Sequence, residues 1–405
     1  MNGAAGDPSG GRRWAPPRPP LRLGIVGLGN VGLGFHLPAL LALPELVTVA
    51  AVADPSADRR EQALRLTGLP AEAAHEASAE LLERDDLDVV DLATPPHIRA
   101  PLALRAIEAG RAVLCEKPIS TIPAEAAAII AAGAERGVPV GVVHNYLEFP
   151  EIRVALAAIA EGRIGVVEVA ILNYLGVEDR PGSAAWQPNW RHDPALAGGG
   201  VLMDMLHVVY LAEALLGSPV ERVSAQVLAR TTPAPLEDIA LCRLEAGGAV
   251  ALVNVGWGVG PGGIAVSGRD GRIEIRYAGG GTSPFAPLES VGLVGRDGSV
   301  EDLTPPVPPR DGALDVHLAA TFRRFFEHVA AGTTPAVTAA DGLRALETTL
   351  AAYASAATGR SVDLPLDAAD PIHRLGIAGL GELPLAAAGP LASGGMFGIG
   401  QGRGR

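Results

Sequence analysis

Short apolar runs alternate with polar, helix-forming stretches over the first third of the chain. The apolar runs, all rich in Val, Leu, Ile and Ala, are residues 21–26, 47–53, 87–93, 111–118 and 138–143. Continuous apolar runs of this length are typical of strands buried on both faces, and the segments between them suit helices. This order predicts an α/β fold with a doubly wound parallel sheet, a Rossmann domain over residues 21–143.

Beyond residue 144 the strands become longer and follow one another without intervening helices. Residues 166–175, 220–228, 239–244 and 249–256 are examples, and several alternate apolar with polar residues. Such alternation is typical of antiparallel strands with one covered face. It predicts a C-terminal α+β domain with a mostly antiparallel open sheet over residues 144–366, flanked by a disordered tail at 1–20 and a Gly/Ala/Pro-rich tail at 367–405.

A glycine turn follows the first predicted strand directly. It has the pattern G-x-G-x-x-G and consists of Gly27, Leu28, Gly29, Asn30, Val31 and Gly32. In dinucleotide-binding folds these glycines allow the tight turn, the close approach of the pyrophosphate and the packing of helix on strand. Gly27, Gly29, Asn30, Val31 and Gly32 are therefore predicted to bind the cofactor, and His36 just after the turn either reaches the ligand or packs locally.

The second predicted strand ends in an acid, Asp54, which lies 22 residues beyond Gly32. A carboxylate at this place binds the ribose hydroxyls of NAD and repels the 2′-phosphate of NADP. The cofactor is therefore predicted to be NAD, with NADP the less favoured alternative that Arg59 and Arg60 would allow.

Two further loops follow predicted strands at the carboxyl edge of the sheet, where open α/β folds bind ligands. The first contains Thr94, Pro95 and His97, and its prolines force an extended loop. The second begins with Glu116 and Lys117, which deliver an acid and a primary amine to the same edge. All five residues are predicted cofactor contacts, and Lys117 is also predicted to be catalytic.

Residues 186–210 interrupt the second sheet and carry three consecutive glycines, residues 198–200, ahead of a predicted helix. On that helix Asp204 and His207 are three residues apart, so they are expected to share a face. A carboxylate beside an imidazole holds one tautomer and lets the ring act as acid or base. Asp204 and His207 are therefore predicted catalytic residues.

The overall charge narrows the range of partners. The chain has 45 acidic residues against 32 Lys and Arg, a net charge of −13, which disfavours nucleic acid and anionic membranes. No apolar run reaches the roughly 18 residues that span a bilayer. Two cysteines, Cys115 and Cys242, build no disulfide framework, and no zinc-type cluster is apparent. A cytoplasmic protein that binds a small molecule is expected.

Together these motifs resemble the Gfo/Idh/MocA oxidoreductases. The residues that carry the resemblance are 27–32, Asp54, Thr94 and Pro95, 109–118, 162–165, and 198–200 with Asp204. The resemblance implies that Lys117 lies between nicotinamide and substrate, often with a cis bond to Pro118, and that the open sheet makes a homodimer or homotetramer interface.

This sequence departs from the family pattern at two histidines. The family usually has a histidine four residues after the aspartate, whereas His207 lies three after Asp204. The histidine usual five residues past Thr94 is replaced by Arg99, and His97 stands two residues earlier. Both departures leave the exact acid–base assignment open.

The expected function is an NAD(P)-dependent dehydrogenase acting on a secondary alcohol of a sugar, cyclitol or related polyol. His207 would accept the hydroxyl proton, with Lys117 sharing that work, and His144 is the alternative proton-transfer residue. The predicted substrate pocket consists of His144, Tyr146, Trp190, Arg191 and Asp204. Two other functions stay open: an NAD-dependent glycoside hydrolase or eliminase that uses transient oxidation, and a non-catalytic NAD-binding regulator.

Overall fold

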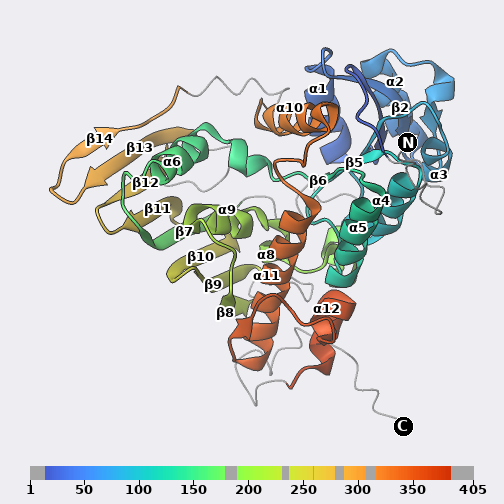
Figure 1. Cartoon of the computed structure of the whole chain (residues 1–405). Helices are drawn as coiled ribbons and strands as arrows, with labels where there is room; N and C mark the ends of the chain where they lie inside the picture. The colour runs from blue at the N-terminus through green and yellow to red at the C-terminus, as the bar shows by residue number, and fades with distance from the viewer. Residues whose placement is uncertain are drawn as a thin grey trace, which may run out of the picture.

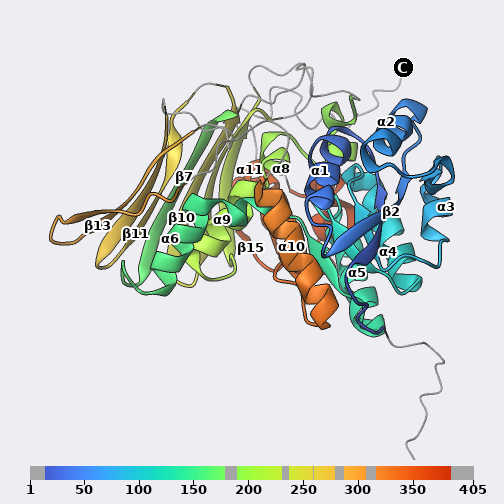
Figure 2. The same cartoon turned by 90° about the horizontal axis from the view of Figure 1, so that it is seen from above.

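The computed structural model describes residues 14–177, 189–229, 237–258, 260–278, 287–306 and 316–384. These residues form two sheets that lie side by side, with helices packed on and between them (Figures 1 and 2). The prediction of a Rossmann domain joined to an α+β domain is therefore confirmed.

The first sheet has six parallel strands in the order β3-β2-β1-β4-β5-β6. Its strands are β1 (Leu21–Val26), β2 (Val47–Ala53), β3 (Ala74–His75), β4 (Val89–Leu92), β5 (Ala112–Cys115) and β6 (Val140–Val142). The helical elements between them are η1 (Gly32–His36), α1 (Leu37–Leu41), α2 (Ala57–Thr67), η2 (Ala71–Ala73), α3 (Ser78–Leu82), η3 (Pro96–Ile98), α4 (Arg99–Glu108) and α5 (Pro123–Arg136). The strand order reverses between β1 and β4, which places a ligand crevice at their carboxyl ends.

The second sheet has nine strands in the order β14-β13-β12-β11-β7-β10-β9-β8-β15, of which only the pair β7 and β10 is parallel among the pairings described. The strands are β7 (Val167–Val177), β8 (Arg222–Leu228), β9 (Ile239–Ala246), β10 (Ala249–Trp257), β11 (Gly262–Gly268), β12 (Gly271–Tyr277), β13 (Leu288–Gly295), β14 (Val300–Asp302) and β15 (Val362–Asp363). The helical elements of this half are η4 (Asn145–Glu148), α6 (Pro150–Ala160), η6 (Asn189–His192), α7 (Pro194–Ala197), α8 (Val201–Asp204), α9 (His207–Leu216), α10 (Val316–Ala331), α11 (Ala339–Thr358), α12 (Pro371–Leu375) and η8 (Gly376–Glu382).

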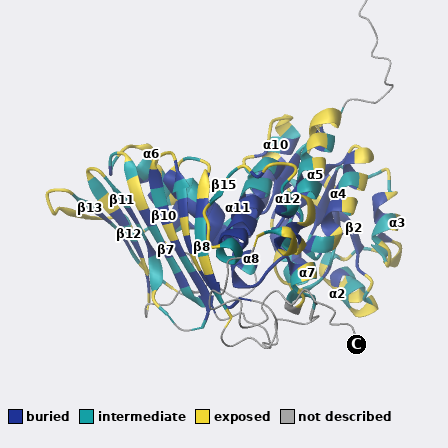
Figure 3. Ribbon diagram, turned by 90° about the horizontal axis from the view of Figure 1, so that it is seen from below, coloured by how far each residue is buried: buried dark blue, intermediate teal, exposed yellow. Residues whose placement is uncertain are grey.

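The predicted alternation of this sheet appears directly in its burial. Along β10 Ala251, Val253 and Val255 are fully buried, whereas Leu252 between them is 39% exposed. Helices α6 and α9 lie along the buried face (Figures 1 and 2). The opposite face carries a mixture of exposed and half-buried residues (Figure 3).

Helix α10 belongs to the core of the first domain although it lies far away in the sequence. Its buried face presents Phe322, Phe325 and Phe326, which join the hydrophobic cluster of the parallel sheet. The helix packs beside α1 (Figure 1). The core of the nucleotide domain therefore extends beyond the predicted residues 21–143, because this aromatic face covers the sheet.

Residues that pack into the folded protein lie within both segments predicted to be tails. Trp14 is partly buried and packs against the hydrophobic core, so the chain joins the folded protein before residue 20. At the other end α12 and η8 follow the predicted boundary at residue 367, and their Ile372 and Leu380 are almost fully buried. These apolar side chains fix the segment against α5 and α11.

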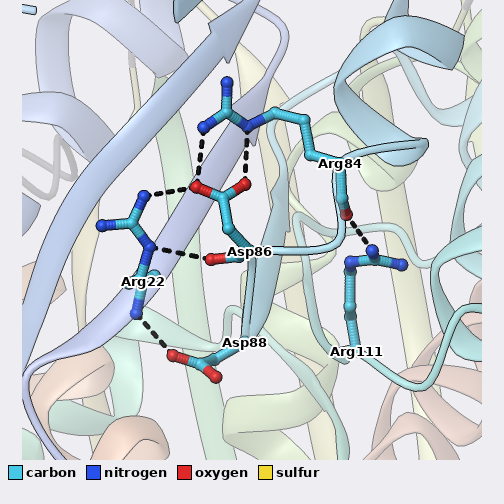
Figure 4. Close-up of polar contacts among 5 residues, drawn as sticks. All are labelled: Arg22, Arg84, Asp86, Asp88 and Arg111. Carbon is cyan, nitrogen blue, oxygen red and sulfur yellow. Dashed lines mark hydrogen bonds and ion pairs between the residues drawn. The ribbon is translucent and has the colours of Figure 1, made fainter.

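A cluster of ion-paired arginines and aspartates lies at the amino edge of the parallel sheet (Figure 4). Asp86 accepts hydrogen bonds from the guanidinium groups of Arg22 and Arg84, and the backbone N–H of Arg22 donates to Asp88 at 2.8 Å. Arg111 donates to the carbonyl of Arg84. The two guanidinium groups lower the pKa of Asp86 to about 2. This cluster ties β1 to the loop before β4, at the edge opposite the predicted ligand crevice.

Candidate active site

The glycine turn has the geometry that a bound pyrophosphate needs. Gly27 has a φ of +95°, and a Cβ on Gly32 would lie 2.1 Å from the carbonyl oxygen of Gly27. Both positions therefore exclude a side chain. A Cβ on Gly29 would meet nothing within 4 Å, so this glycine faces open space. The turn is compact on the protein side and accessible on the other, as close approach of a phosphate requires.

Asp54 is fixed to this turn. One carboxylate oxygen accepts the backbone N–H of Leu28 at 2.8 Å, and the other accepts that of Ser56 at 2.8 Å. The side chain is 5% exposed, and the guanidinium of Arg59 lies 3.9 Å away. Arg60 is directed elsewhere, because it donates to the carbonyl oxygen of Asp54 at 2.7 Å. The acid is thus held beside the turn by backbone amides and not by a strong ion pair.

Two side-chain atoms of the loop after β4 are buried without a hydrogen-bond partner. They are Oγ1 of Thr94 and Nδ1 of His97. Buried polar atoms normally have a hydrogen-bond partner, so two such atoms without one in the same loop indicate room for a ligand. Arg99, which replaces the usual histidine, is buried and donates to the carbonyl oxygens of Thr94 and Pro118. Its guanidinium therefore joins this loop to the one that carries Lys117.

Lys117 directs its amine from the end of β5 toward the second domain. The peptide bond between Lys117 and Pro118 is cis. Nζ donates a hydrogen bond to the backbone carbonyl oxygen of Asp204 at 2.5 Å, which joins the parallel sheet to the end of α8. Burial lowers the pKa of the Lys117 amine, and the nearby carboxylates of Asp204 and Glu116 oppose that shift in part.

Lys117 is also the only lysine in the 405-residue chain, and the other 31 basic residues are arginines. An arginine stays protonated at any pH that a protein survives, whereas a lysine amine can give up its proton when it is buried. A single lysine in an arginine-rich chain is a signal in the sequence for this position.

The expected pairing of Asp204 with His207 is wrong. Helix α8 ends at Asp204 and α9 begins at His207, and the axes of 194–204 and 207–216 differ by 47°. The carboxylate of Asp204 lies 3.7 Å from the guanidinium of Arg191. Nδ1 of His207 lies instead 2.6 Å from the hydroxyl of Tyr210. The two residues do not share a helix face because the chain bends between them.

His207 lies at one end of a stack of rings, next to Tyr146. Its imidazole stacks on Tyr146 with centroids 3.8 Å apart, and the hydroxyl of Tyr210 also accepts the backbone N–H of Tyr146 at 3.1 Å. Burial, with a smaller contribution from the charge of Lys117, holds the pKa of His207 well below its ordinary value. The ring is therefore neutral at physiological pH.

His144 lies on the far side of Tyr210. The two rings stack at 3.9 Å, and His144 also lines a cavity of about 270 Å³ with Glu213, Asp341 and Arg344. Burial lowers the pKa of His144 to about 3. Tyr210 thus separates it from His207, and the ring is neutral too.

Of the remaining predicted substrate residues, Arg191 contacts Asp204, whereas Tyr146 packs beside His207. Arg191 in η6 lies over the indole of Trp190 at 5.3 Å from the ring centroid, and its ion pair with Asp204 links η6 to α8. Tyr146 is 7% exposed and is packed between His207 and Phe149. Trp186, which begins the interrupting segment, lies outside the described residues.

Glu237 is a residue of this region that the sequence reasoning missed. Its buried carboxylate accepts the backbone N–H groups of Gly200 at 2.8 Å and Leu202 at 2.9 Å, and the hydroxyl of Tyr353 at 2.7 Å. Burial raises its pKa to about 7. A Cβ on Gly200 would lie 2.3 Å from the carbonyl oxygen of Glu237, so the glycine is needed for this contact. The acid fixes the start of α8, and no local signal marks it because it lies 37 residues from Gly200.

Two further properties of the described residues bear on the class of protein. No group of three His, Cys, Asp or Glu side chains within them is arranged to hold a metal ion. No single helix among them is long and apolar enough to cross a membrane. The two helical segments 194–204 and 207–216 together have that length and composition, but they are bent by 47°.

Models of both domains of one protein family match the chain. The N-terminal model, described as an oxidoreductase family with an NAD-binding Rossmann fold, matches residues 21–144. The Gfo/Idh/MocA C-terminal domain model matches residues 152–278.

Curated relatives agree with these family matches. Levoglucosan dehydrogenase from Pseudarthrobacter phenanthrenivorans is 30% identical over 272 residues, which cover 64% of this chain and 65% of that protein. A dTDP-3,4-didehydro-2,6-dideoxy-alpha-D-glucose 3-reductase from Actinomadura kijaniata is 31% identical over 208 residues, 51% of this chain and 59% of that protein. The chain thus matches less than two thirds of the length of these relatives.

Solved structures match over more of the chain. Levoglucosan dehydrogenase in complex with NADH and L-sorbose has a TM-score of 0.75 at 23% identity, covering 86% of this chain and 99% of that one. Aldose-aldose oxidoreductase from Caulobacter crescentus, complexed with glycerol, has a TM-score of 0.72 at 25% identity, covering 85% and 99%.

Fold and site together define a dinucleotide-binding Rossmann protein. Its second, open-sheet domain contacts the carboxyl edge of the first sheet through Asp204 and Lys117. Within that class, the chain belongs to the Gfo/Idh/MocA family of oxidoreductases.

Proposed function

We propose that this protein is an NAD-dependent oxidoreductase that transfers a hydride between nicotinamide and a secondary alcohol of a sugar, cyclitol or related polyol. The names of its relatives support a sugar substrate, and they include a 1,5-anhydro-D-fructose reductase from Ensifer adhaerens, 28% identical over 297 residues. The observation that carries the proposal is the single lysine of the chain, desolvated and held between the two domains by Asp204.

The residues of the crevice fit NAD. The open side of Gly29 would receive the pyrophosphate, Asp54 the ribose hydroxyls, and the unpaired atoms of Thr94 and His97 further polar groups. Asp54 favours NAD over NADP, because its carboxylate would repel a 2′-phosphate. When bound, NAD supplies the hydride acceptor at the end of the sheet where Lys117 lies.

Lys117 is the proton-transfer residue that the electrostatics favour. A general base works best when its pKa lies near the operating pH. Burial lowers the pKa of Lys117 and so brings it closer to pH 7. Burial also lowers the pKa of His207, but that pKa is ordinarily near 6.5, so it moves further from pH 7. The amine in its neutral form would take the proton of the substrate hydroxyl as the hydride leaves.

His207 then acts as a neutral hydrogen-bonding group. The hydroxyl of Tyr210 already accepts the N–H of Tyr146, so its own hydrogen is free to reach Nδ1 of His207. This hydrogen-bond network favours the tautomer that carries the ring hydrogen on Nε2. Nε2–H would donate to the oxygen on which charge develops.

Trp190, Arg191 and Asp204 would form the outer wall of the substrate site. An indole face suits a sugar ring, and a carboxylate and a guanidinium suit its hydroxyl groups. His144 would contribute indirectly, since it supports the ring of Tyr210.

A homodimer or homotetramer through the open sheet is the favoured assembly. Val169, Leu241 and Leu252 are each 38–39% exposed on that face, in the neighbouring strands β7, β9 and β10. Light scattering tests it: Leu252→Glu should yield monomers, and unchanged oligomers would exclude this face.

A cytoplasmic location is the favoured setting. Cys115 and Cys242 are both free thiols, which suits a reducing compartment. Cell fractionation tests it, and recovery with a secreted or membrane fraction would contradict it.

The activity itself is tested with a panel of sugars and cyclitols plus NAD, followed at the NADH absorbance. Stoichiometric NADH is expected with at least one substrate. Cleavage of a glycoside with no net NADH would replace the dehydrogenase by the hydrolase mechanism. If Lys117→Ala left every turnover unchanged while NAD still bound, neither enzymatic function would stand and a regulatory role would remain.

A further inference from the structure

The imidazole of His36 is fully buried between two carboxylates. Nδ1 lies 2.8 Å from Oδ2 of Asp91, and Nε2 lies 3.1 Å from Oε1 of Glu116. His36 and Asp91 have no exposed surface, and the rings of His36 and Phe322 of α10 make a T-shaped contact with centroids 5.0 Å apart. Ionised carboxylates only accept hydrogen bonds, so a place between two of them favours a ring that donates from both nitrogens, which is an imidazolium.

This bridge continues to the catalytic loop. The second oxygen of Glu116, Oε2, accepts the backbone N–H of Lys117 at 2.7 Å. Three elements are thereby joined: η1 directly after the glycine turn, strand β4, and the end of β5. Among the bridging residues, His36 lies four residues beyond Gly32, the last glycine of the predicted phosphate-binding turn.

The charges around the bridge support the imidazolium form. The two carboxylates raise the pKa of His36 to about 10 against the opposing effect of its burial. The same contact lowers the pKa of Glu116, whose other charged neighbours are Lys117 and Arg99. The positive charge of the imidazolium therefore offsets the negative charge of Glu116, the carboxylate that accepts the backbone N–H of Lys117.

A purely structural ion pair is the alternative. Buried ion pairs give little net stability, and hydrophobic groups of similar volume often replace them without loss. Here, however, one partner of the imidazolium also fixes a backbone amide of the proposed catalytic residue. From the other side, Arg99 donates to the carbonyl oxygen of Pro118, so the segment 116–118 is held at both ends.

We propose that His36 is a positioning residue for Lys117: its imidazolium holds the side chain of Glu116 in place, and Glu116 holds the backbone that aims the amine at the reacting alcohol. The link also couples the phosphate-binding segment to the amine. The catalytic consequence rests on the proposed oxidoreductase function, whereas the effect on the amine does not.

The test uses His36→Gln, which keeps a hydrogen-bond donor and removes the charge. His373→Gln is the matched control, because His373 also pairs with a carboxylate, Glu347 at 3.2 Å, but in the helices α12 and α11. Misplacing a catalytic group by about 1 Å costs on the order of 100-fold in rate. His36→Gln should therefore lower kcat on the order of 10- to 100-fold with little change in the KM for sugar, and His373→Gln should change neither.

A second readout is independent of turnover. Because the chain has one lysine, [ε-13C]lysine labelling gives a single side-chain signal whose titration reports Lys117 alone. In His36→Gln the charge of Glu116 is no longer balanced, so the pKa of Lys117 should rise relative to wild type and His373→Gln. Nitrogen-15 spectra of labelled histidine should show a ring with both nitrogens protonated at pH 8, absent from His36→Gln.

A neutral His36 ring at pH 8, or a Lys117 titration that stays unchanged or moves down in His36→Gln, would overturn the proposal. If His36→Gln does not fold, Glu116→Gln tests the same bridge from its other end: loss of the doubly protonated ring supports it and retention overturns it. Should no sugar be oxidised by the wild type, the proposed function fails, and the two spectroscopic results still decide the role of His36.

Discussion

The amine of Lys117 donates to the backbone carbonyl of Asp204, 2.5 Å away, so the contact across the domain boundary depends on the path of the chain at the end of α8. The carboxylate of Asp204 pairs with Arg191, and in the proposed function it would also contact the substrate. This arrangement makes the start of α8 important, because whatever shifts that helix moves the acceptor of the lysine.

Lys117→Arg should abolish most of the activity while NADH still binds. Arginine keeps the positive charge but does not release a proton at working pH. Loss of proton transfer by a positioned side chain lowers kcat by about 100-fold or more. Kinetics and fluorescence titration of NADH measure the two effects, and a variant with more than about a tenth of wild-type kcat would show that the amine only supplies charge.

Tyr210→Phe should impair catalysis and stability together. It removes the hydroxyl that hydrogen-bonds Nδ1 of His207 and the backbone N–H of Tyr146, so each of these buried groups loses that partner. The free energy of unfolding should fall by about 1–3 kcal/mol, and kcat should fall as the ring of His207 loses its orientation. Tyr277→Phe is the control and should leave kcat unchanged, because Tyr277 lies in β12 and its hydroxyl donates to Glu151 of α6. Equal kcat in both variants would exclude an orienting role for Tyr210.

Gly200→Ala should destabilise the protein through α8. The added methyl would lie 2.3 Å from the carbonyl oxygen and 2.4 Å from the carboxylate of Glu237. Overpacking of this kind costs about 1–3 kcal/mol, and urea denaturation measures it. Gly292→Ala, where a Cβ meets nothing within 4 Å, serves as the control. A stable Gly200→Ala with full activity would show that the contact with Glu237 is not needed.

The stability of the protein should decline between pH 6.5 and about 10 because of His36. Its pKa is raised from 6.5 to about 10 in the folded state, so the folded protein holds a proton that the unfolded chain releases in this range. The contribution of the imidazolium is complete below pH 6.5 and is lost as the pH rises through 10. Denaturation curves at pH 7 and pH 10 should differ less in His36→Gln than in wild type, and an equal difference would contradict the account.

The sequence predicted the parts of the site that depend on local patterns. An apolar strand precedes each of three features: the glycine turn, Asp54 and the loop at Thr94. Their position at the carboxyl edge of the sheet could therefore be inferred from spacing alone. Lys117 could be placed for the same reason, since it ends a buried strand.

The partners of these residues could not be predicted in the same way. The sequence analysis placed Asp204 and His207 on one helix, and nothing in the intervening Met205 and Leu206, both good helix formers, indicates a break. In the structure both side chains are buried and the chain bends there. That bend separates Asp204 from His207. Contacts such as the one between Glu237 and Gly200 depend on how distant segments pack, which a single sequence does not display.

The most direct test is the pH dependence of the one lysine, compared with that of turnover. The [ε-13C]lysine signal should titrate below the ordinary lysine pKa, because burial of the amine lowers it. The rising limb of kcat for alcohol oxidation should follow the same pKa, persist in His207→Ala and vanish in Lys117→Arg. An amine that titrates at the ordinary lysine value, or a limb that vanishes in His207→Ala and persists in Lys117→Arg, would contradict the assignment of proton transfer to Lys117.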